Sequence, residues 1–474
     1  LWGRIPFLNF FDGFRTSHEI QKIACWSQKE LQELFPVEDV MAFRRCALNS
    51  NHPVEMGAAQ NPDIFFQVKE ASNLDYERLP VLVKGCLAKI NEKCGTHYRL
   101  YEYVGSKDAT TIIIAMGSVC ETIEETIPFL QEKGEKVGCL KVRLYRPFSK
   151  ADFLDAIPDT VECIQVLDRT KEPGTIGEPL YEDVVTALQE SAYKDVEIFS
   201  GRYGLSSKET TPEQIVSVFH NRVKRRFTIG IRDDVTNLSL EEEKLDFAPI
   251  EGQMNCKFWG IGSDGTVGEN KNTIQIIGDY TKLHVQAYFE YDSKKSGGVT
   301  ISHLRFGTSE IKSEYGVKRA QLVACHCPAY LGRYEIVQDL EEGGTFLLNC
   351  SWKKEELAER LPEDVKQYLA EKKIRFYIID AAKIAKELGL AHRTNTILQA
   401  AFFTLTDILP KETALEAMKQ AVQKSYLKKG EEVIAKNLLA VERGFVAAEE
   451  VEIPADWKKK QVVIQECGAD TERH

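Results

Sequence analysis

Runs of apolar residues alternate with stretches of helical spacing along much of the chain, and this alternation predicts its elements. The β-branched run at residues 111–116 is followed, at 120–134, by Ile123, Ile127 and Leu130, which share one face of a helix. The same order continues with residues 136–145 (strand), 150–157 (helix), 161–168 (strand) and 180–191 (helix). Such repetition is typical of a parallel sheet covered by helices.

The second half of the chain repeats this pattern and then becomes mainly helical. A buried strand at 255–259 precedes a helix in which Val267, Asn270, Ile274 and Ile277 recur. Further strands are expected at residues 284–291, 299–306, 321–325, 346–350 and 374–379. Helices are expected at residues 384–388, 396–409, 413–427 and 431–446. The fold class that follows is α/β, with more than one domain.

The first hundred residues carry a weaker pattern. Residues 5–11 are an apolar run that predicts a strand, and Ser17 resembles the start of a helix. Arg15, Thr16, Ser17 and His18 lie where ligand-binding loops occur in α/β sheets, although a helix cap with solvated neighbours explains them as well. Helical spacing follows at residues 28–45 and 80–94, on either side of an irregular stretch at residues 49–66.

Length and punctuation predict how these elements divide into domains. A chain of 474 residues accommodates about three domains. We expect boundaries after His97, where a glycine follows a predicted helix, and after an acidic connector that ends near residue 248. The predicted domains are residues 1–97, 98–248 and 249–458, and residues 459–474 are expected to be a linker or the start of another domain.

Composition and charge exclude several classes of function. No apolar run is long enough to cross a membrane, and a net charge of −11 argues against a general nucleic-acid surface. A polyanionic ligand would therefore need a local cluster of basic groups and backbone amides. The 12 cysteines are scattered without a Cys-x-x-Cys pair, as expected of reduced thiols. Only Cys325-His326-Cys327 leaves a metal site open, with ligands supplied from elsewhere.

The most informative single stretch is the glycine-rich turn between the strand at 255–259 and the helix after it. Gly260, Gly262, Gly265 and Gly268 allow the backbone to turn sharply and to approach a ligand closely. The N–H groups of the first helical turn lack intrahelical partners and attract phosphate. The turn alone is equally consistent with a tight connection in an α/β domain.

Longer motifs carry a resemblance to a known family. They occupy residues 4–20, 59–63, 141–148, 167–174, 262–268 and 291–298. In these motifs the sequence resembles the pyruvate:ferredoxin (or flavodoxin) oxidoreductases, the large single-chain 2-oxoacid oxidoreductases. The resemblance implies a C-terminal part of a thiamine pyrimidine-binding domain at 1–97, a domain similar to the transketolase C-terminal domain at 98–248, and a gamma-subunit-like domain at 249–458.

The resemblance also implies an activity and a set of cofactors. Such enzymes decarboxylate pyruvate with thiamine diphosphate and Mg, pass electrons through 4Fe-4S clusters to ferredoxin or flavodoxin, and form acetyl-CoA and CO2. They are usually homodimers. The sequence contains neither the iron–sulfur cysteine motif nor the magnesium–diphosphate motif of thiamine enzymes. We therefore expect a central fragment with no catalytic or metal-binding residues of its own and no turnover alone.

What this chain is expected to contribute is a site for coenzyme A. The positions that match the family are Gly262, Ser263, Asp264, Gly265, Thr266, Lys294, Asn395 and Asn437. An amide nest and a lysine neutralise phosphate, and asparagine side chains both donate and accept hydrogen bonds. Lys294 and Lys295 are adjacent, and the sequence leaves open which of them faces the ligand.

Other interpretations remain open at this point. The same scaffold could act on another 2-oxoacid or feed electrons to a fused reductase. A different class is a non-catalytic coenzyme A-binding module that docks other subunits. The expected location is the cytoplasm, or a hydrogenosome-type organelle in a eukaryote.

Overall fold

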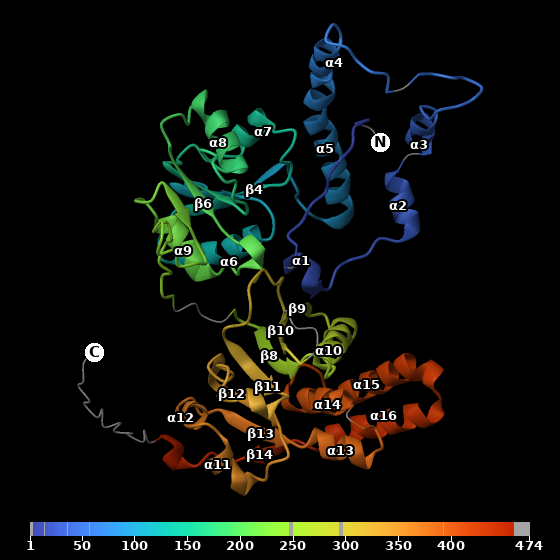
Figure 1. Ribbon diagram of the computed structural model, residues 1–474, viewed down its shortest axis with the longest axis vertical. Helices are drawn as coiled ribbons and strands as arrows, with labels where there is room; N and C mark the ends of the chain where they lie inside the picture. The colour runs from blue at the N-terminus through green and yellow to red at the C-terminus, as the bar shows by residue number, and fades with distance from the viewer. Residues whose placement is uncertain are drawn as a thin grey trace, which may run out of the picture. The chain divides into compact units, whose positions relative to one another are not determined.

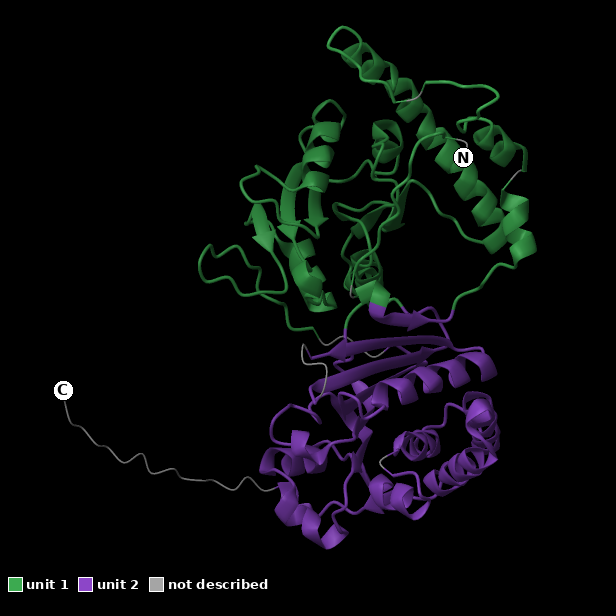
Figure 2. Cartoon of the chain, turned by 45° about the vertical axis from the view of Figure 1, so that its right-hand side comes forward, with its two compact units in different colours: residues 1–17, 23–247, 312–315 green, residues 18–22, 248–311, 316–474 purple. Residues whose placement is uncertain are grey.

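Figure 1 shows the computed structural model, which describes residues 3–13, 15–35, 37–55, 57–245, 250–292, 297–391 and 393–458. The chain forms two compact units (Figure 2). The first unit contains residues 1–17, 23–247 and 312–315. The second unit contains residues 18–22, 248–311 and 316–474.

The first unit is built on a six-stranded sheet with the order β2-β4-β3-β5-β6-β7. The strand β2 is antiparallel to β4, and the remaining neighbours are parallel. The strands are β2 (Tyr101–Gly105), β3 (Thr111–Ala115), β4 (Val137–Val142), β5 (Cys163–Asp168), β6 (Glu197–Arg202) and β7 (Arg226–Thr228). The helices that accompany them are α6 (Val119–Glu132), α7 (Lys150–Asp155), α8 (Pro179–Gln189) and α9 (Pro212–His220).

Alternate residues of this sheet enter two separate cores. Ile113 lies in a core with α6 and α9, whereas Ile112 and Ile114 lie in a core with α7 and α8. Since successive side chains of a strand point to opposite faces, helices cover both sides of the sheet. The continuous apolar run at 111–116 follows from this double burial.

The start of α6 is held by charged groups of the same unit. The Oδ2 atom of Asp12 accepts the N–H of Ser118 at 2.5 Å, and Asp12 pairs with Arg169 at 2.8 Å. A carboxylate at this position is favourable because a helix N-terminus carries partial positive charge. The N-terminal segment therefore fills the end of α6 with its own carboxylate.

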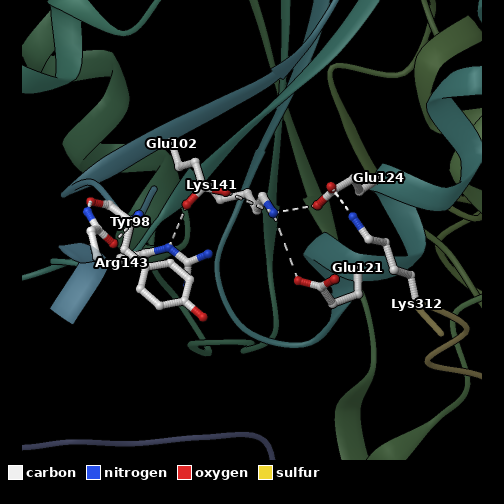
Figure 3. A network of polar contacts seen from close by, with 8 residues as sticks. Tyr98, Glu102, Glu121, Glu124, Lys141, Arg143 and Lys312 are labelled. Atoms are coloured by element: carbon white, nitrogen blue, oxygen red, sulfur yellow. Dashed lines mark hydrogen bonds and ion pairs between the residues drawn. The ribbon is translucent and has the colours of Figure 1, made fainter. Parts of the chain in front are cut away.

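Figure 3 shows a second set of charges, centred on Lys141 of β4. Its ammonium group contacts Glu124, and lies 3.2 Å from Glu102 and 3.9 Å from Glu121. Lys312 also pairs with Glu124. Burial alone would lower the pKa of Lys141, but its bonds to these carboxylates outweigh burial and raise that pKa.

The first hundred residues expose many apolar side chains. The helices here are α1 (Arg15–His18), α2 (Gln28–Leu34), α3 (Val37–Arg44), α4 (Phe65–Ala71) and α5 (Asn73–Cys94). Leu8 is 86% exposed, and only Leu79 of α5 is buried. The strand predicted at 5–11 was wrong, because these residues pair with no neighbouring strand and remain irregular. The helix predicted to start at Ser17 instead begins at Arg15 and gives way to β1 (Glu19–Gln21).

The second unit is built on an eight-stranded mixed sheet with the order β1-β9-β10-β8-β11-β12-β13-β14. Strands β8, β11, β12 and β13 are parallel neighbours, while β10 runs antiparallel to both β8 and β9. Strands of this unit not yet given are β8 (Gln253–Ile261), β9 (His284–Tyr291), β10 (Val299–Gly307), β11 (Ala320–Cys325), β12 (Leu340–Asn349), β13 (Arg375–Ile379) and β14 (Glu449–Val451). Its helices are α10 (Thr266–Tyr280), α11 (Leu357–Arg360), α12 (Glu363–Glu371), α13 (Ala381–Glu387), α14 (Asn395–Leu405), α15 (Lys411–Tyr426) and α16 (Glu431–Gly444).

Two cores lie on opposite faces of this sheet. Phe258 packs with α10 and the C-terminal helices α13 to α16, whereas Trp259 packs with α11 and α12. This one-residue alternation fixes the register, since a slip of one position would exchange the two faces. The carboxyl ends of β8 and β11 are neighbours, with Trp259 opposite Cys325.

The α/β fold class is confirmed, and most predicted elements of the second unit lie within a few residues of their observed bounds. Strand β9 has the predicted bounds. The sequence interpretation did not identify β2, β6, β7, β14, α4, α9, α11 or α12. The domain boundaries remain a prediction, and residues 459–474, Lys294 and Lys295 lie outside the described residues.

Candidate functional site

The glycine-rich turn connects β8 to α10 with two residues in the left-handed backbone region. Gly265 has a φ of 92° and Ser263 a φ of 80°. Glycine adopts such angles without strain, whereas serine rarely does. Interactions with neighbouring residues must therefore hold Ser263 in this conformation. An added Cβ at Gly265 would lie 1.9 Å from the Nδ2 atom of Asn395, so a larger residue would displace that side chain and would also be strained by the positive φ.

The side chain of Asp264 holds this turn. Its Oδ2 accepts the N–H of Ile261 and its Oδ1 accepts the N–H of Thr266, each at 2.8 Å. The N–H of Gly262 donates to the carbonyl of Gly298 at 2.7 Å. The Asp264 carboxylate therefore links the two ends of the turn, and one of its bonds is to the first N–H of α10.

Other N–H groups of the turn are left available. Among the described residues, no acceptor lies at hydrogen-bond distance from the N–H groups of Ser263, Gly265, Val267 and Gly268. They stand at the positively polarised end of α10. Unpaired backbone donors of this kind bind water or an anionic ligand.

A cleft of about 390 Å³ opens beside the turn, entirely within the second unit. Its lining residues are Ile261, Gly262, Ser263, Asp264, Gly265, Val267, Tyr291, Asp292, Gly298, Val299 and Thr300. They come from the turn and from the facing ends of β9 and β10. The cleft thus combines polarised amides, two carboxylates and an apolar wall.

The structure places one of the predicted asparagines against the turn, whereas the other is bonded within its own helix. Asn395, the first residue of α14, lies against Gly265. Asn437 is buried in α16, and its Nδ2 donates to the carbonyl of Val433 in the same helix at 2.8 Å. Among the described residues, no hydrogen bond joins Asn437 to the turn. Lys294 lies outside the described residues, and Asp292 and Gly298, which precede and follow it in the sequence, both line the cleft.

Thr266 is turned away from the cleft toward a buried histidine. Its Oγ1 lies 2.9 Å from Nδ1 of His326, which follows β11. The Oε2 atom of Glu269, on the first turn of α10, lies 4.0 Å from the same Nδ1 and has no hydrogen-bond partner. Burial lowers the pKa of His326 to about 4 and raises the pKa of Glu269 well above its ordinary value. Burial therefore disfavours the charged form of both side chains.

The Cys325-His326-Cys327 sequence is used for internal bonds. The Sγ atom of Cys325 donates to the carbonyl of Cys327 at 3.1 Å, and the His326 ring bonds to Thr266. Within the described ranges, no group of three or more His, Cys, Asp or Glu side chains is arranged to hold a metal ion.

The N-terminal candidates also make contacts inside the protein. Arg15 is buried, with its Nε 3.1 Å from Glu314 and its Nη2 3.3 Å from the carbonyl of Ser313. His18 packs edge-on against the ring of Tyr291 at 5.7 Å. These contacts support the structural interpretation of this segment.

Sequence reasoning missed several residues that line the cleft, and three of them have polar side chains, namely Tyr291, Asp292 and Thr300. Tyr291 and Asp292 begin the motif at 291–298 and could have been singled out by it. Thr300 gave no signal, since a threonine in a β-branched run reads as an ordinary strand residue. In the part of the chain that the structure describes, no helix is long and apolar enough to cross a membrane.

Three family models match successive parts of the chain. The model described as pyruvate flavodoxin/ferredoxin oxidoreductase, thiamine diP-bdg, matches residues 3–86. The model for pyruvate:ferredoxin oxidoreductase core domain II matches residues 109–215. The model for pyruvate ferredoxin/flavodoxin oxidoreductase matches residues 255–447, the stretch that contains the cleft.

Individual relatives agree with these models. The pyruvate:ferredoxin oxidoreductase of Moorella thermoacetica is 51% identical over 462 residues, which are 96% of this chain and 39% of the relative. The pyruvate-flavodoxin oxidoreductase of Enterobacter agglomerans is 50% identical over 462 residues, again 96% of this chain and 39% of the relative. Among solved structures, pyruvate oxidoreductase subunit PORC of Thermotoga maritima is 21% identical, with a TM-score of 0.35. The match covers 43% of this chain and 100% of that subunit.

The fold and the three matches define a multidomain α/β chain of the 2-oxoacid oxidoreductase class. The chain belongs to the pyruvate:ferredoxin/flavodoxin oxidoreductase family. It spans about two fifths of the length of the relatives it matches, 39% in both cases given above.

Proposed function

We propose that the second unit binds coenzyme A at the cleft beside the Gly262–Thr266 turn, as part of an enzyme that oxidatively decarboxylates pyruvate. In that enzyme the reaction yields acetyl-CoA and CO2, and the electrons pass to ferredoxin or flavodoxin. This chain supplies the site that presents the acyl acceptor. The residues that break the carbon–carbon bond are not assigned to it.

One observation carries the proposal. Four N–H groups, those of Ser263, Gly265, Val267 and Gly268, have no hydrogen-bond partner among the described residues and stand at the positive end of a 15-residue helix, beside the cleft. A diphosphate provides the negative charge and the acceptor oxygens that such a set requires. Coenzyme A carries a diphosphate and a further ribose phosphate.

The two carboxylates of the cleft restrict where phosphate can lie. Asp264 is held by two N–H groups of the turn, so its charge is partly offset. Asp292 also lines the cleft and precedes Lys294 and Lys295 in the sequence. A lysine would supply positive charge to offset Asp292 and the phosphate groups, and Lys294 is the one we assign to the ligand. Asn395 would bond the ligand next to Gly265, and Asn437 would act from α16.

The wider assignments extend this proposal to the rest of the chain. Residues 1–97 would complete the thiamine pyrimidine-binding domain, 98–248 would form the transketolase C-terminal-like domain, and 249–458 would form the coenzyme A-binding domain. Thiamine diphosphate, Mg and the 4Fe-4S clusters are expected in the complete enzyme, and the magnesium–diphosphate and iron–sulfur motifs would lie in parts of the longer relatives that this chain does not match. The complete enzyme would be a cytoplasmic homodimer.

The experiment is a calorimetric titration of the 474-residue chain with coenzyme A. Lys294→Ala is expected to weaken binding about tenfold, because one charge-assisted contact to phosphate is lost. Lys295→Ala is the matched control, being the same change one residue away, and is expected to leave the Kd within about twofold of the unchanged chain. Thermal melts of all three proteins check that they are folded.

Two results would count against the proposal in different ways. No binding of coenzyme A by the folded, unchanged chain would reject the site. Normal binding by Lys294→Ala together with weak binding by Lys295→Ala would keep the site and reverse the assignment of the two lysines.

A further inference from the structure

Thr300 lies on the wall of the cleft, and its buried hydroxyl group has no hydrogen-bond partner among the described residues. The residue is 6% exposed. A buried hydroxyl that makes no hydrogen bond destabilises a protein, so it calls for a physical explanation.

The sheet register places Thr300 next to the turn. Thr300 of β10 lies opposite Gly260 of β8 on one side and opposite Tyr291 of β9 on the other. Residues two apart on a strand share a face, and Leu304 of the same strand packs in the core that contains α10. The hydroxyl of Thr300 therefore lies on the face of the sheet where α10 begins.

The position opposite Thr300 cannot hold a larger residue. A Cβ added to Gly260 would lie 2.5 Å from Oγ1 of Thr266 and 2.9 Å from Oδ2 of Asp264. The oxygens nearest to Gly260 are thus already engaged, since Thr266 bonds to His326 and Asp264 bonds to the turn. Thr300 has no such bond, although it lies directly across the strand pair.

From this arrangement we propose that Thr300 is a ligand-binding residue whose hydroxyl donates a hydrogen bond to the diphosphate of the nucleotide-bearing molecule in the cleft. The proposal rests on the proposed function of the cleft and adds a residue that the family motifs do not contain. The donor would act together with the unpaired N–H groups of Gly265 and Val267. The structural cost of its burial is then recovered when the ligand binds.

The proposal has a consequence that a purely structural threonine would not have. In Thr300→Val a methyl group replaces the hydroxyl at nearly constant shape, and both residues are β-branched, which suits a strand. The free protein loses an unpaired buried polar group, so its melting temperature is expected to stay the same or rise. Ligand binding is expected to weaken at the same time, because the donor is absent.

The test measures both properties in the 474-residue chain. Coenzyme A and ADP, which share a diphosphate, are titrated into the unchanged chain, Thr300→Val and Thr300→Ser. Thr300→Val is expected to raise the Kd of both ligands about tenfold, the usual effect of one hydrogen bond to a charged group. Thr300→Ser keeps the hydroxyl and is expected to retain binding within about threefold, although it loses a methyl group from the core.

The outcomes separate this proposal from the one on which it rests. If the unchanged chain binds coenzyme A and Thr300→Val binds it equally well, the role of Thr300 is rejected and the cleft remains the site. If Thr300→Val melts at a much lower temperature, the hydroxyl is a structural group and the proposal is also rejected. If the folded, unchanged chain binds neither ligand, the proposed function fails and the role of Thr300 fails with it.

Discussion

The two units each contain a strand that turns through glycine into a helix, but they treat the helix N-terminus differently. At α6 the turn contains Gly117 and Ser118, and the N–H of Ser118 donates a hydrogen bond to the carboxylate of Asp12 at 2.5 Å. A Cβ on Gly117 would lie 2.8 Å from Asp12, so this glycine makes room for a protein group. At α10 the glycines border a cleft instead.

The acidic residues on the two helices differ in the same way. Glu121 and Glu124 of α6 face Lys141, and Glu124 also pairs with Lys312. Glu269 of α10 is buried, and its Oε2 has no hydrogen-bond partner. The same motif therefore serves stability at α6, where the chain satisfies its own polar groups, and we propose that it serves binding at α10, where N–H groups of the turn lack partners within the described residues. A glycine-rich turn is informative about a ligand only once its N–H groups have been accounted for.

The largest effect is expected from removing the central charge beside α6. Lys141→Met would leave Glu102, Glu121 and Glu124 without their shared partner in a half-buried site. We expect a loss of about 3 kcal/mol in the free energy of unfolding, measured by denaturant titration of the first unit's transition. Lys136→Met removes an exposed lysine that pairs with Asp108, and serves as the control with no measurable change. Equal stability of the two variants would contradict the contrast drawn between α6 and α10.

A smaller effect is expected from the carboxylate at the end of α6. Asp12→Asn keeps the shape of the side chain but removes its charge from Ser118 and from Arg169. The free energy of unfolding should fall by about 2 kcal/mol, because a charge-assisted hydrogen bond and a well-shielded ion pair are lost together. Thermal melting checks this, with the exposed Asp108→Asn as reference. An unchanged melting temperature would show that α6 does not depend on its filled terminus.

The smallest effect is expected at Glu269 and depends on pH. Burial raises the folded-state pKa of Glu269 above its unfolded value, so its contribution to stability is full below the unfolded pKa and is lost as pH rises through the folded pKa. Glu269→Gln does not ionise. The variant should therefore gain stability relative to the unchanged chain as the pH rises from about 5 to about 8. A difference that stays constant across denaturation curves in this range would mean that Glu269 is not a buried titrating group.

The sequence predicted the second unit well for physical reasons. Strand β9 at His284–Tyr291 and helix α14 at Asn395–Leu405 are bounded by local patterns of apolar residues, which one window of sequence contains. The run at 5–11 has the same kind of pattern but no strand beside it, and the pattern alone carries no information on neighbours. Strand β1 is the opposite case. It has no strand pattern of its own in the sequence and forms because Ile20 pairs with Ala287, far along the chain.

The candidate site could be predicted only in part. The glycine turn and Asn395 were identified through motifs, and the structure places them in contact. The bond between Thr266 and His326 joins residues 60 positions apart, so it has no local signal. The unpaired hydroxyl of Thr300 likewise depends on which atoms surround it after folding. The pattern of unpaired groups, rather than the presence of particular residue types, distinguishes the cleft from the filled turn at α6.

The most direct test of this contrast is hydrogen–deuterium exchange of the chain with and without coenzyme A, followed by mass spectrometry of its peptides. The account predicts slower exchange in peptides that contain Gly265 and Val267 when coenzyme A is present. It predicts no change in peptides that contain Ser118, whose N–H is already bonded to Asp12. Binding that leaves exchange at residues 262–268 unchanged, or that protects the turn at α6 instead, would contradict the central claim.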